Sequence, residues 1–241
     1  MKKLKIVRKR RIILSIIVLF STTTLTLRCF KKVYPHNIYI FGDELFTKDE
    51  ILKNSNINFP KPLLFVKTKY AERQLKKNLY LSNVSITRQI LPFGLKIFIQ
   101  TRQPIAYGEK IENGKEIKGF VDRNGFFIDE KFADKKNLKD FSTSIFGWKY
   151  EYIRTISEIF NYSFDHNIIF QKINFSSNGF LILEEVNLKK IILGNNTKIL
   201  ETQMKAIRNI KNELTDENFL EKIDTIDLRD PKNPKIKVFK P

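Results

Sequence analysis

The chain has 241 residues, of which 42% are hydrophobic, and it carries a formal net charge of +18. The apolar content excludes a disordered chain, and the length allows one or two domains of ordinary size. One Cys and two His exclude an internal disulfide and argue against a structural zinc site, which needs several nitrogen or sulfur ligands.

The positive charge is concentrated at the N-terminus, directly before an apolar run. An excess of this size indicates an anionic neighbour, either a nucleic acid or a membrane surface. Residues 12–27 contain no charge, Gly or Pro, and residues 12–30 as a helix would span about 28 Å, enough to cross a bilayer. Because a basic flank stays in the cytoplasm, we expect a cytoplasmic tail at 1–11 and extracytoplasmic domains after the helix. The predicted orientation depends on Lys2, Lys3, Lys5, Arg8, Lys9, Arg10 and Arg11.

A cleaved signal peptide is the alternative interpretation of this segment. Its basic start and short apolar core fit, but residues 22–30 offer no Ala-x-Ala-like cleavage site. Arg28 precedes Cys29 where a lipoprotein needs a small residue, so a lipid anchor at Cys29 is also disfavoured. A basic DNA-binding arm fits less well, because the uncharged run behind it would have no role in solution. The sequence therefore predicts an uncleaved, single-pass anchor at 12–30.

The next segment, residues 35–103, begins with a strand and two helices. Residues 37–42 form a short apolar run that ends at Gly. Thr47 and Glu50 have the spacing of a capping box, which predicts a helix from Thr47 to Asn54. Thr68 is the expected cap of a second helix, which runs to about residue 79 and turns its apolar positions to the core.

A hairpin completes this segment. Residues 84–90 and 95–99 alternate apolar and polar side chains, as half-buried strands do, and Leu91-Pro92-Phe93-Gly94 supplies the turn between them. A hairpin, a further strand and two covering helices make a small α+β module.

Several motifs in this order carry a resemblance to a known family. They are Gly42 after the first strand, Thr47-x-x-Glu50-Ile51, Leu64-Phe65-Val66, the alternating run 84–99 and the exit Arg102-x-Pro104-Ile105-Ala106. The segment resembles the POTRA domain of FtsQ/DivIB, a family of bacterial cell division proteins, and the exit motif is its most specific part. Residues 119–127 resemble the hairpin that follows POTRA in that family. Their Asn124-Gly125 pair favours a tight turn with positive φ. The chain departs from the family pattern at Tyr80-Leu81 and Tyr107, where the family often has Pro-Trp and Trp.

The remaining residues, 104–241, predict a larger mixed β-sheet domain with covering helices. Apolar periodicity predicts helices at 150–160 and 198–214, while 129–149 are poorly patterned and predict a loop with a short helix. The strand-like runs are 119–128, 168–175, 180–184, 188–193, 223–229 and 236–238. The whole chain is thus expected to be α+β, with a transmembrane helix, a POTRA domain at 35–103 and a second domain at 104–241.

The resemblance implies a non-enzymatic scaffold of the divisome at the septum, with both domains in the periplasm. It further implies that the second domain binds FtsB/FtsL-like partners by strand addition at a sheet edge, and that POTRA engages other septal membrane proteins. For Ile226 and Leu228 the alternative is a purely structural place in the core. The candidate contact residues are Thr225, Ile226, Asp227, Leu228 and Arg229.

The sequence shows no catalytic constellation, and it predicts no cofactor, metal, small-molecule substrate or nucleic acid as ligand. The loop at Gly108-x5-Gly114-Lys115 lacks the spacing of a phosphate loop and predicts a polar hairpin turn. The pairs Asp129-Glu130 and Glu184-Glu185 are expected to be solvated charges, because neighbours on a strand point apart. A membrane-anchored envelope enzyme that uses these acids, or another POTRA-type assembly factor, remains the alternative.

Overall fold

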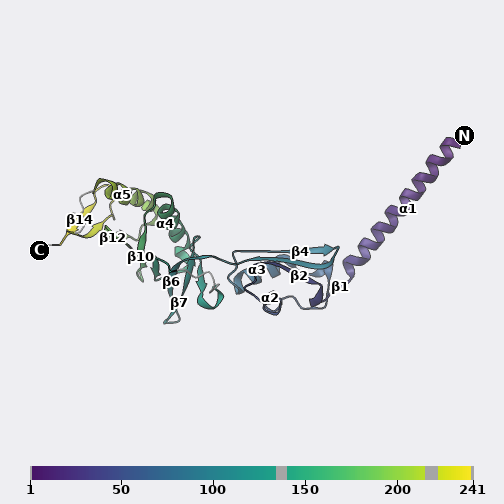
Figure 1. The fold of residues 1–241 in the computed structure, drawn as a ribbon, viewed down its shortest axis with the longest axis horizontal. Coiled ribbons are helices and arrows are strands. Elements are labelled where there is room, and N and C mark those ends of the chain that lie inside the picture. The colour runs from purple at the N-terminus through teal and green to yellow at the C-terminus, as the bar shows by residue number, and fades with distance from the viewer. Residues whose placement is uncertain (1, 134–139, 215–221, 240–241) are drawn as a thin grey trace. The chain divides into compact units, whose positions relative to one another are not determined.

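The structure is a computed structural model that describes residues 2–133, 140–214 and 222–239, with side chains described from residue 13 onward. The chain divides into two compact units, unit 1 (Met1–Thr101) and unit 2 (Arg102–Pro241). Both units combine helices with a β-sheet, as Figure 1 shows, so the predicted α+β class is confirmed.

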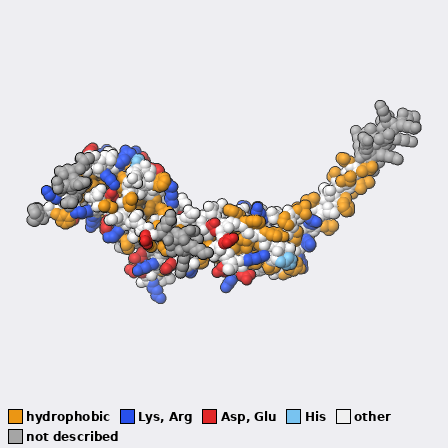
Figure 2. Space-filling model, viewed as in Figure 1, with side chains coloured by type: hydrophobic (Ala, Val, Ile, Leu, Met, Phe, Trp, Pro, Cys, Tyr) orange, Lys and Arg blue, Asp and Glu red, His pale blue; other side chains and the backbone are white. Residues whose placement is uncertain are grey.

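Unit 1 begins with one continuous helix, α1 (Lys2–Phe30). Its segment Ile13–Phe30 has a mean hydropathy of 1.8, and none of that segment is buried. Within the described residues it is the one helix that is long and apolar enough to cross a membrane, and hydrophobic side chains cover much of it (Figure 2). The helix supports the predicted single-pass anchor. The orientation predicted from Lys2, Lys3, Lys5, Arg8, Lys9, Arg10 and Arg11 stays a prediction, because their side chains lie outside the described part.

The polar residues in the second half of α1 are compatible with a lipid environment. The hydroxyl of Thr22 donates to the carbonyl of Leu19 at 2.9 Å, and that of Thr26 donates to the carbonyl of Thr22 at 2.7 Å. A hydroxyl that donates one turn back has its hydrogen bond satisfied inside the helix, which lowers its cost in hydrocarbon.

The rest of unit 1 is a three-stranded sheet in the order β2-β5-β4, with β2 parallel and β4 antiparallel to β5. The predicted capping box is present: the Thr47 hydroxyl accepts from the Glu50 N–H, and the Glu50 carboxylate accepts from the Thr47 N–H at 2.8 Å. The predicted cap at Thr68 is wrong, because the cap position is Lys67 and Thr68 is the first helical residue, nearly buried. After α1, the elements of unit 1 are β1 (Lys32–Val33), η1 (Pro35–Asn37), β2 (Ile38–Gly42), α2 (Lys48–Asn54), β3 (Lys61–Pro62), η2 (Leu63–Phe65), α3 (Thr68–Asn78), β4 (Asn83–Ile90) and β5 (Phe93–Gln100).

Unit 2 is built on a nine-stranded sheet in the order β14-β13-β12-β11-β10-β9-β6-β7-β8. Two helices, α4 and α5, bury their apolar faces in the same core as these strands, with Ile156 and Ile159 from α4 and Met204 and Ile207 from α5. The elements are β6 (Pro104–Glu112), β7 (Lys115–Asp122), β8 (Phe127–Asp129), η3 (Glu130–Phe132), β9 (Ser144–Phe146), η5 (Tyr150–Tyr152), α4 (Ile153–His166), β10 (Phe170–Phe175), β11 (Leu181–Glu185), β12 (Lys189–Gly194), η6 (Thr197–Ile199), α5 (Leu200–Glu213), β13 (Ile223–Asp227) and β14 (Lys235–Val238).

The hairpin predicted for residues 119–127 is present: β7 and β8 are joined by a turn in which Gly125 has the predicted positive φ, 80°. One detail of unit 2 differs from the sequence prediction. The poorly patterned stretch 129–149 contains β9, which lies between β6 and β10 and is parallel to both. β9 has only three residues, too few for any apolar periodicity to be recognised, and residues 134–139 of that stretch lie outside the described part.

Candidate partner-binding site

The predicted contact segment, residues 225–229, is not at the edge of the sheet. β13 pairs in parallel with β12, where Ile226 lies opposite Ile191, and antiparallel with β14, where Ile226 lies opposite Ile236. A strand with neighbours on both sides has no free backbone edge for a further strand. The edge position predicted for Thr225, Ile226, Asp227, Leu228 and Arg229 is therefore wrong.

The apolar side chains of this segment belong to the core. Ile223, Ile226 and Leu228 are each 0% exposed and belong to the buried cluster that also contains the apolar residues of α4 and α5. Ile223 and Ile226 are three positions apart, which in a regular strand would place them on opposite faces. The pairing shifts between Ile223 and Thr225, and this bulge returns Ile223 to the core face.

Hydrogen bonds from α5 hold the end of this segment in place. Gln203 on α5 is 1% exposed, and its amide donates to the carbonyls of Leu193 at 2.8 Å and Leu228 at 2.9 Å. The N–H of Leu228 donates to the carbonyl of Ile192 at 2.8 Å. A buried side-chain amide that satisfies two carbonyls, one within β12 and one directly after β13, fixes the helix on the sheet.

The polar side chains of the segment interact mainly with one another. Arg229 pairs with Asp227 at 2.6 Å, and this hydrogen bond lowers the pKa of Asp227 and raises the pKa of Arg229. The Thr225 hydroxyl donates to the carboxylate of Asp224 at 3.2 Å. The three predicted polar contact residues are thus partly exposed, and two of them are already paired.

Within the described residues, the edge at this end of the sheet is β14, which pairs with β13 alone. All four of its residues are exposed, and Ile236 and Val238 alternate with Lys235 and Lys237. Phe239 follows, exposed, with its N–H donating to the carbonyl of Lys222 at 2.8 Å. The sequence predicted a strand at 236–238 but not its edge position, because that position depends on its pairing with β13.

The acid pair Glu184-Glu185, considered for an enzymatic alternative, has structural partners. Glu184 pairs with Lys172 at 2.8 Å on the sheet surface. Glu185 is not solvated as predicted: it is 3% exposed, pairs with Lys211 at 2.7 Å, and accepts from two N–H groups of the following turn. Burial of this carboxylate is possible because the turn directs two N–H groups onto it, and their hydrogen bonds offset the cost of removing the charge from water.

The acids at the other end of the sheet are ordinary surface groups. Asp129 accepts from the N–H of Lys131 at 3.2 Å and pairs with its ammonium at 3.4 Å, so that it caps the short helix η3. Glu130 is the first residue of that helix and is exposed. In the part of the chain that the structure describes, no three His, Cys, Asp or Glu residues are grouped as metal ligands.

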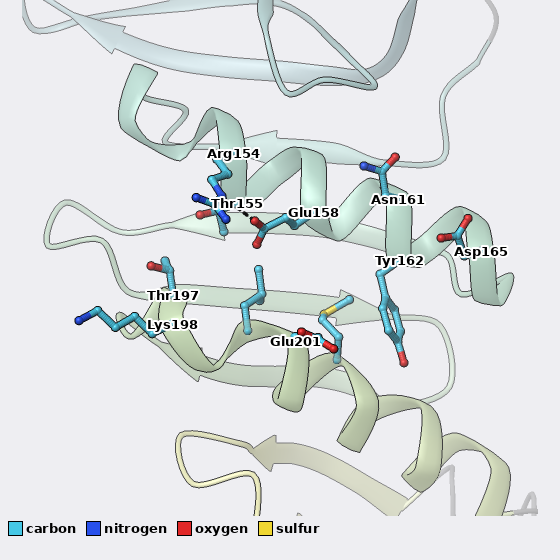
Figure 3. Close-up of a pocket in the computed structure, with 11 residues that line it drawn as sticks. Arg154, Thr155, Glu158, Asn161, Tyr162, Asp165, Thr197, Lys198 and Glu201 are labelled. Atoms are coloured by element: carbon cyan, nitrogen blue, oxygen red, sulfur yellow. Dashed lines mark hydrogen bonds and ion pairs between the residues drawn. The ribbon is translucent and has the colours of Figure 1, made fainter.

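A groove of about 630 Å³ lies between α4 and α5, and sequence reasoning gave no sign of it. Its acids are partly paired within each helix, with Arg154 to Glu158 at 2.8 Å and Lys205 to Glu201 at 2.7 Å. The buried hydroxyl of Tyr162 has no hydrogen-bond partner in the described structure, and burial raises its pKa. The lining shown in Figure 3 comprises Arg154, Thr155, Glu158, Asn161, Tyr162, Asp165, Thr197, Lys198, Leu200, Glu201 and Met204.

Comparison with known families bears on unit 1. Residues 35–102 match the family model described as the POTRA domain, FtsQ-type. The resemblance predicted from the sequence is confirmed over these residues. A search of the curated proteins finds no match to the chain. Residues after 102, including β13 and β14, lie outside the matched segment.

Proposed function

We propose that the protein is a non-enzymatic scaffold of the bacterial division machinery, held in the inner membrane with its N-terminus in the cytoplasm and both domains in the periplasm. The observation that carries this proposal is an FtsQ-type POTRA domain, residues 35–102, placed directly after a helix of membrane-spanning length. The proposed role is to link the cytoplasmic division ring to septal wall synthesis by assembling other membrane proteins.

The second domain is the proposed binding surface for FtsB/FtsL-like partners, and strand addition at β14 is the proposed mode. An unpaired strand edge offers backbone donors and acceptors to an incoming strand, and alternate side chains select the partner. Lys235 and Lys237 favour a partner strand with acidic residues, because complementary charge steers encounter and suppresses wrong partners. This moves the proposed contact from residues 225–229 to residues 235–238, with Arg229 and Asp227 near its start.

The first experiment locates the full chain in living cells with a fluorescent protein fused to Met1. A band at mid-cell in dividing cells is the expected result. Uniform membrane fluorescence throughout constriction would contradict the divisome role and favour the anchored envelope enzyme. For that alternative, Asp129, Glu130 and Glu184 are the acids to replace together, because Glu185 is buried and its loss would disturb folding.

The second experiment tests the edge strand by photo-crosslinking in cells. A benzoylphenylalanine at position 237 in β14 is expected to capture a small membrane protein. The matched control is position 172, also an exposed Lys, but on β10, where it pairs with Glu184 of β11 on one side and with Ser144 of β9 on the other. Equal crosslinking from both positions, or none from position 237, would count against strand addition at β14.

A further inference from the structure

The end of α1 is fastened to the POTRA domain by contacts with two segments distant in sequence. β1 follows the helix after one residue and pairs antiparallel with β3, and the Leu63 N–H donates to the Lys31 carbonyl at 3.0 Å. The guanidinium of Arg28 donates to the carbonyl of Ile90 at 3.2 Å, at the end of β4. The short helix η2 and the turn between β4 and β5 therefore lie beside the last turn of α1.

Both of these segments expose apolar side chains where they meet the helix. Leu91, in the turn, is 78% exposed, and Phe65, in η2, is 56% exposed. Leu64 and Phe30 are exposed as well, and the rings of Phe30 and Phe65 meet edge to face with centroids 6.3 Å apart. We call these four residues the membrane-proximal face. Hydrophobic side chains are visible in Figure 2 where the helix joins the domain.

The outward direction of Leu64 and Phe65 is fixed by the fold. They stand between Leu63 and Val66, which are 2% and 0% exposed in the core. Arg88 holds this turn by donating to the carbonyls of Leu63 at 3.1 Å and Val66 at 2.6 Å. Two apolar side chains are thus kept on the surface, although a chain free to minimise exposed apolar area would turn them inward.

Groups suited to a lipid headgroup region surround this face. The ammonium of Lys31 lies 5.2 Å from the centre of the Phe93 ring, and Tyr34 is exposed and stacks on His36 at 5.6 Å. The short helix η1, which carries His36, packs closely on the start of β5. The approach is so close that a Cβ added to Gly94 would lie 1.9 Å from the carbonyl oxygen of Asn37. Tyrosine is enriched at membrane interfaces, and lysine can reach lipid phosphates while its stem stays on apolar surface.

We propose that the membrane-proximal face docks on the lipid bilayer, so that the POTRA domain rests on the outer leaflet beside its own anchor. The proposal rests on the membrane anchor of the proposed function, because the face is continuous with the end of the segment Ile13–Phe30. Interfacial apolar side chains reach about 5–10 Å into the boundary between headgroups and acyl chains. Docking would fix the tilt of the POTRA domain relative to the membrane.

The test uses the full chain in vesicles of phosphatidylethanolamine and phosphatidylglycerol that contain a nitroxide lipid, with a shallow label to probe positions 91 and 111 and a deep label to probe position 19. Cys29 is first replaced by Ser, and an environment-sensitive fluorophore is then attached at one new cysteine. Leu91→Cys probes the face, and Leu19→Cys probes the anchor. Ile111→Cys is the matched control, an aliphatic side chain that is 68% exposed near the tip of the β6–β7 hairpin in unit 2.

The label at position 91 is expected to emit at shorter wavelength than the label at 111 and to be quenched at least about twofold more strongly by the nitroxide lipid. A label at 91 that behaves like the label at 111, while the label at 19 is quenched, would overturn docking and leave the anchor intact. Absence of quenching at 19 and 91 alike would overturn both. A blue-shifted label at 91 that the nitroxide lipid does not quench would indicate contact with protein, such as a second copy, and would also overturn lipid docking.

Discussion

β13 and β14 are neighbours in one sheet, yet they differ in nearly every property that bears on function. The apolar side chains of β13 are in the core, and both of its edges are paired. β14 buries none of its residues and pairs on one side only within the described structure. The comparison teaches that the segment with the stronger apolar pattern maintains the fold, whereas the weaker segment beside it has one edge that no described strand pairs with.

The difference arises from what covers each strand. β13 lies in parallel beside β12, and α5 packs over this part of the sheet through Met204 and Gln203. β14 carries two Lys in four residues, a composition that natural proteins use to discourage indiscriminate edge pairing. A strand edge with positive charges can still pair with a strand that carries negative charges. In this proposal the two lysines of β14 therefore discourage aggregation and also select the partner.

The largest expected effect comes from making the same substitution, Ile to Glu, at one position on β13 and at the position opposite it on β14. Ile226 and Ile236 face each other in the ladder, and they are 0% and 38% exposed. Ile226→Glu buries a carboxylate in the core and should destabilise unit 2 by about 4 kcal/mol or more, whereas Ile236→Glu should cost less than about 1 kcal/mol. Urea unfolding followed by the fluorescence of Trp148, the single Trp of the chain, measures both.

Trp148 is a suitable reporter because it is built into unit 2. Its indole N–H donates to the Gly125 carbonyl at 2.9 Å, and its ring lies 5.4 Å from that of Phe127. Equal destabilisation by the two substitutions would contradict the contrast between β13 and β14. If Ile226→Glu unfolds unit 2, as expected, a loss of partner binding in this variant says nothing about the interface.

The next largest effect concerns the hydrogen bonds that Gln203 of α5 donates to β12 and to the residue after β13. Gln203→Leu keeps the volume but removes the donor to the carbonyls of Leu193 and Leu228, which should cost about 1–3 kcal/mol in the free energy of unfolding. Gln203→Glu is the companion variant, since it keeps the shape but replaces the amide donor with a buried acid. Unchanged stability in both variants would show that other donors satisfy these carbonyls.

A smaller effect on stability, with a clear effect on binding, is expected from charge reversal on β14. Lys235→Glu combined with Lys237→Glu changes exposed side chains and should shift the free energy of unfolding by less than about 0.5 kcal/mol. Capture of the partner by the crosslinker should fall in cells, because the edge would repel an acidic strand. The matched control is Lys115→Glu with Lys118→Glu, on β7, which should leave capture unchanged. Undiminished capture by the β14 variant would contradict charge selection at this edge.

Local signals in unit 1 predicted its structure well. Thr47 and Glu50 form the capping box that their spacing predicts, and the alternation of Leu95, Ile97 and Ile99 gives three buried side chains. These features depend on residues a few positions apart, where sterics and hydrogen bonding act within one element. Thr68 failed as a cap because Lys67 takes that position and the helix begins one residue earlier.

Unit 2 depends more on contacts between distant segments, and there the sequence was less informative. The strands β11 and β12 were predicted from their patterns, but β9 was not, because its place between β6 and β10 is fixed only by pairing. The order of β12, β13 and β14 likewise follows from packing under α5, so an apolar run such as 223–228 could not be assigned to an edge or an interior by periodicity. The burial of Glu185 follows from turn geometry, which charge patterns do not reveal.

The smallest expected effect concerns the ion pair of Asp227 and Arg229 at the surface end of β13. The hydrogen bond from Arg229 lowers the pKa of Asp227 in the folded state, so the pair stabilises the fold above the ordinary aspartate pKa. This contribution is lost as the pH falls through the lowered pKa, and it is modest because Arg229 is largely exposed and solvent screens the pair. Asp227→Asn should therefore lower the urea midpoint of Trp148 fluorescence slightly near neutral pH, and the difference from the wild type should shrink as the pH falls through the lowered pKa of Asp227. A difference that persists unchanged in acid would mean that Asp227 acts through its shape and its hydrogen bond to the Arg229 N–H, not through its charge. The polar end of β13 would then be as purely structural as its buried isoleucines, and the contrast with β14 would become sharper.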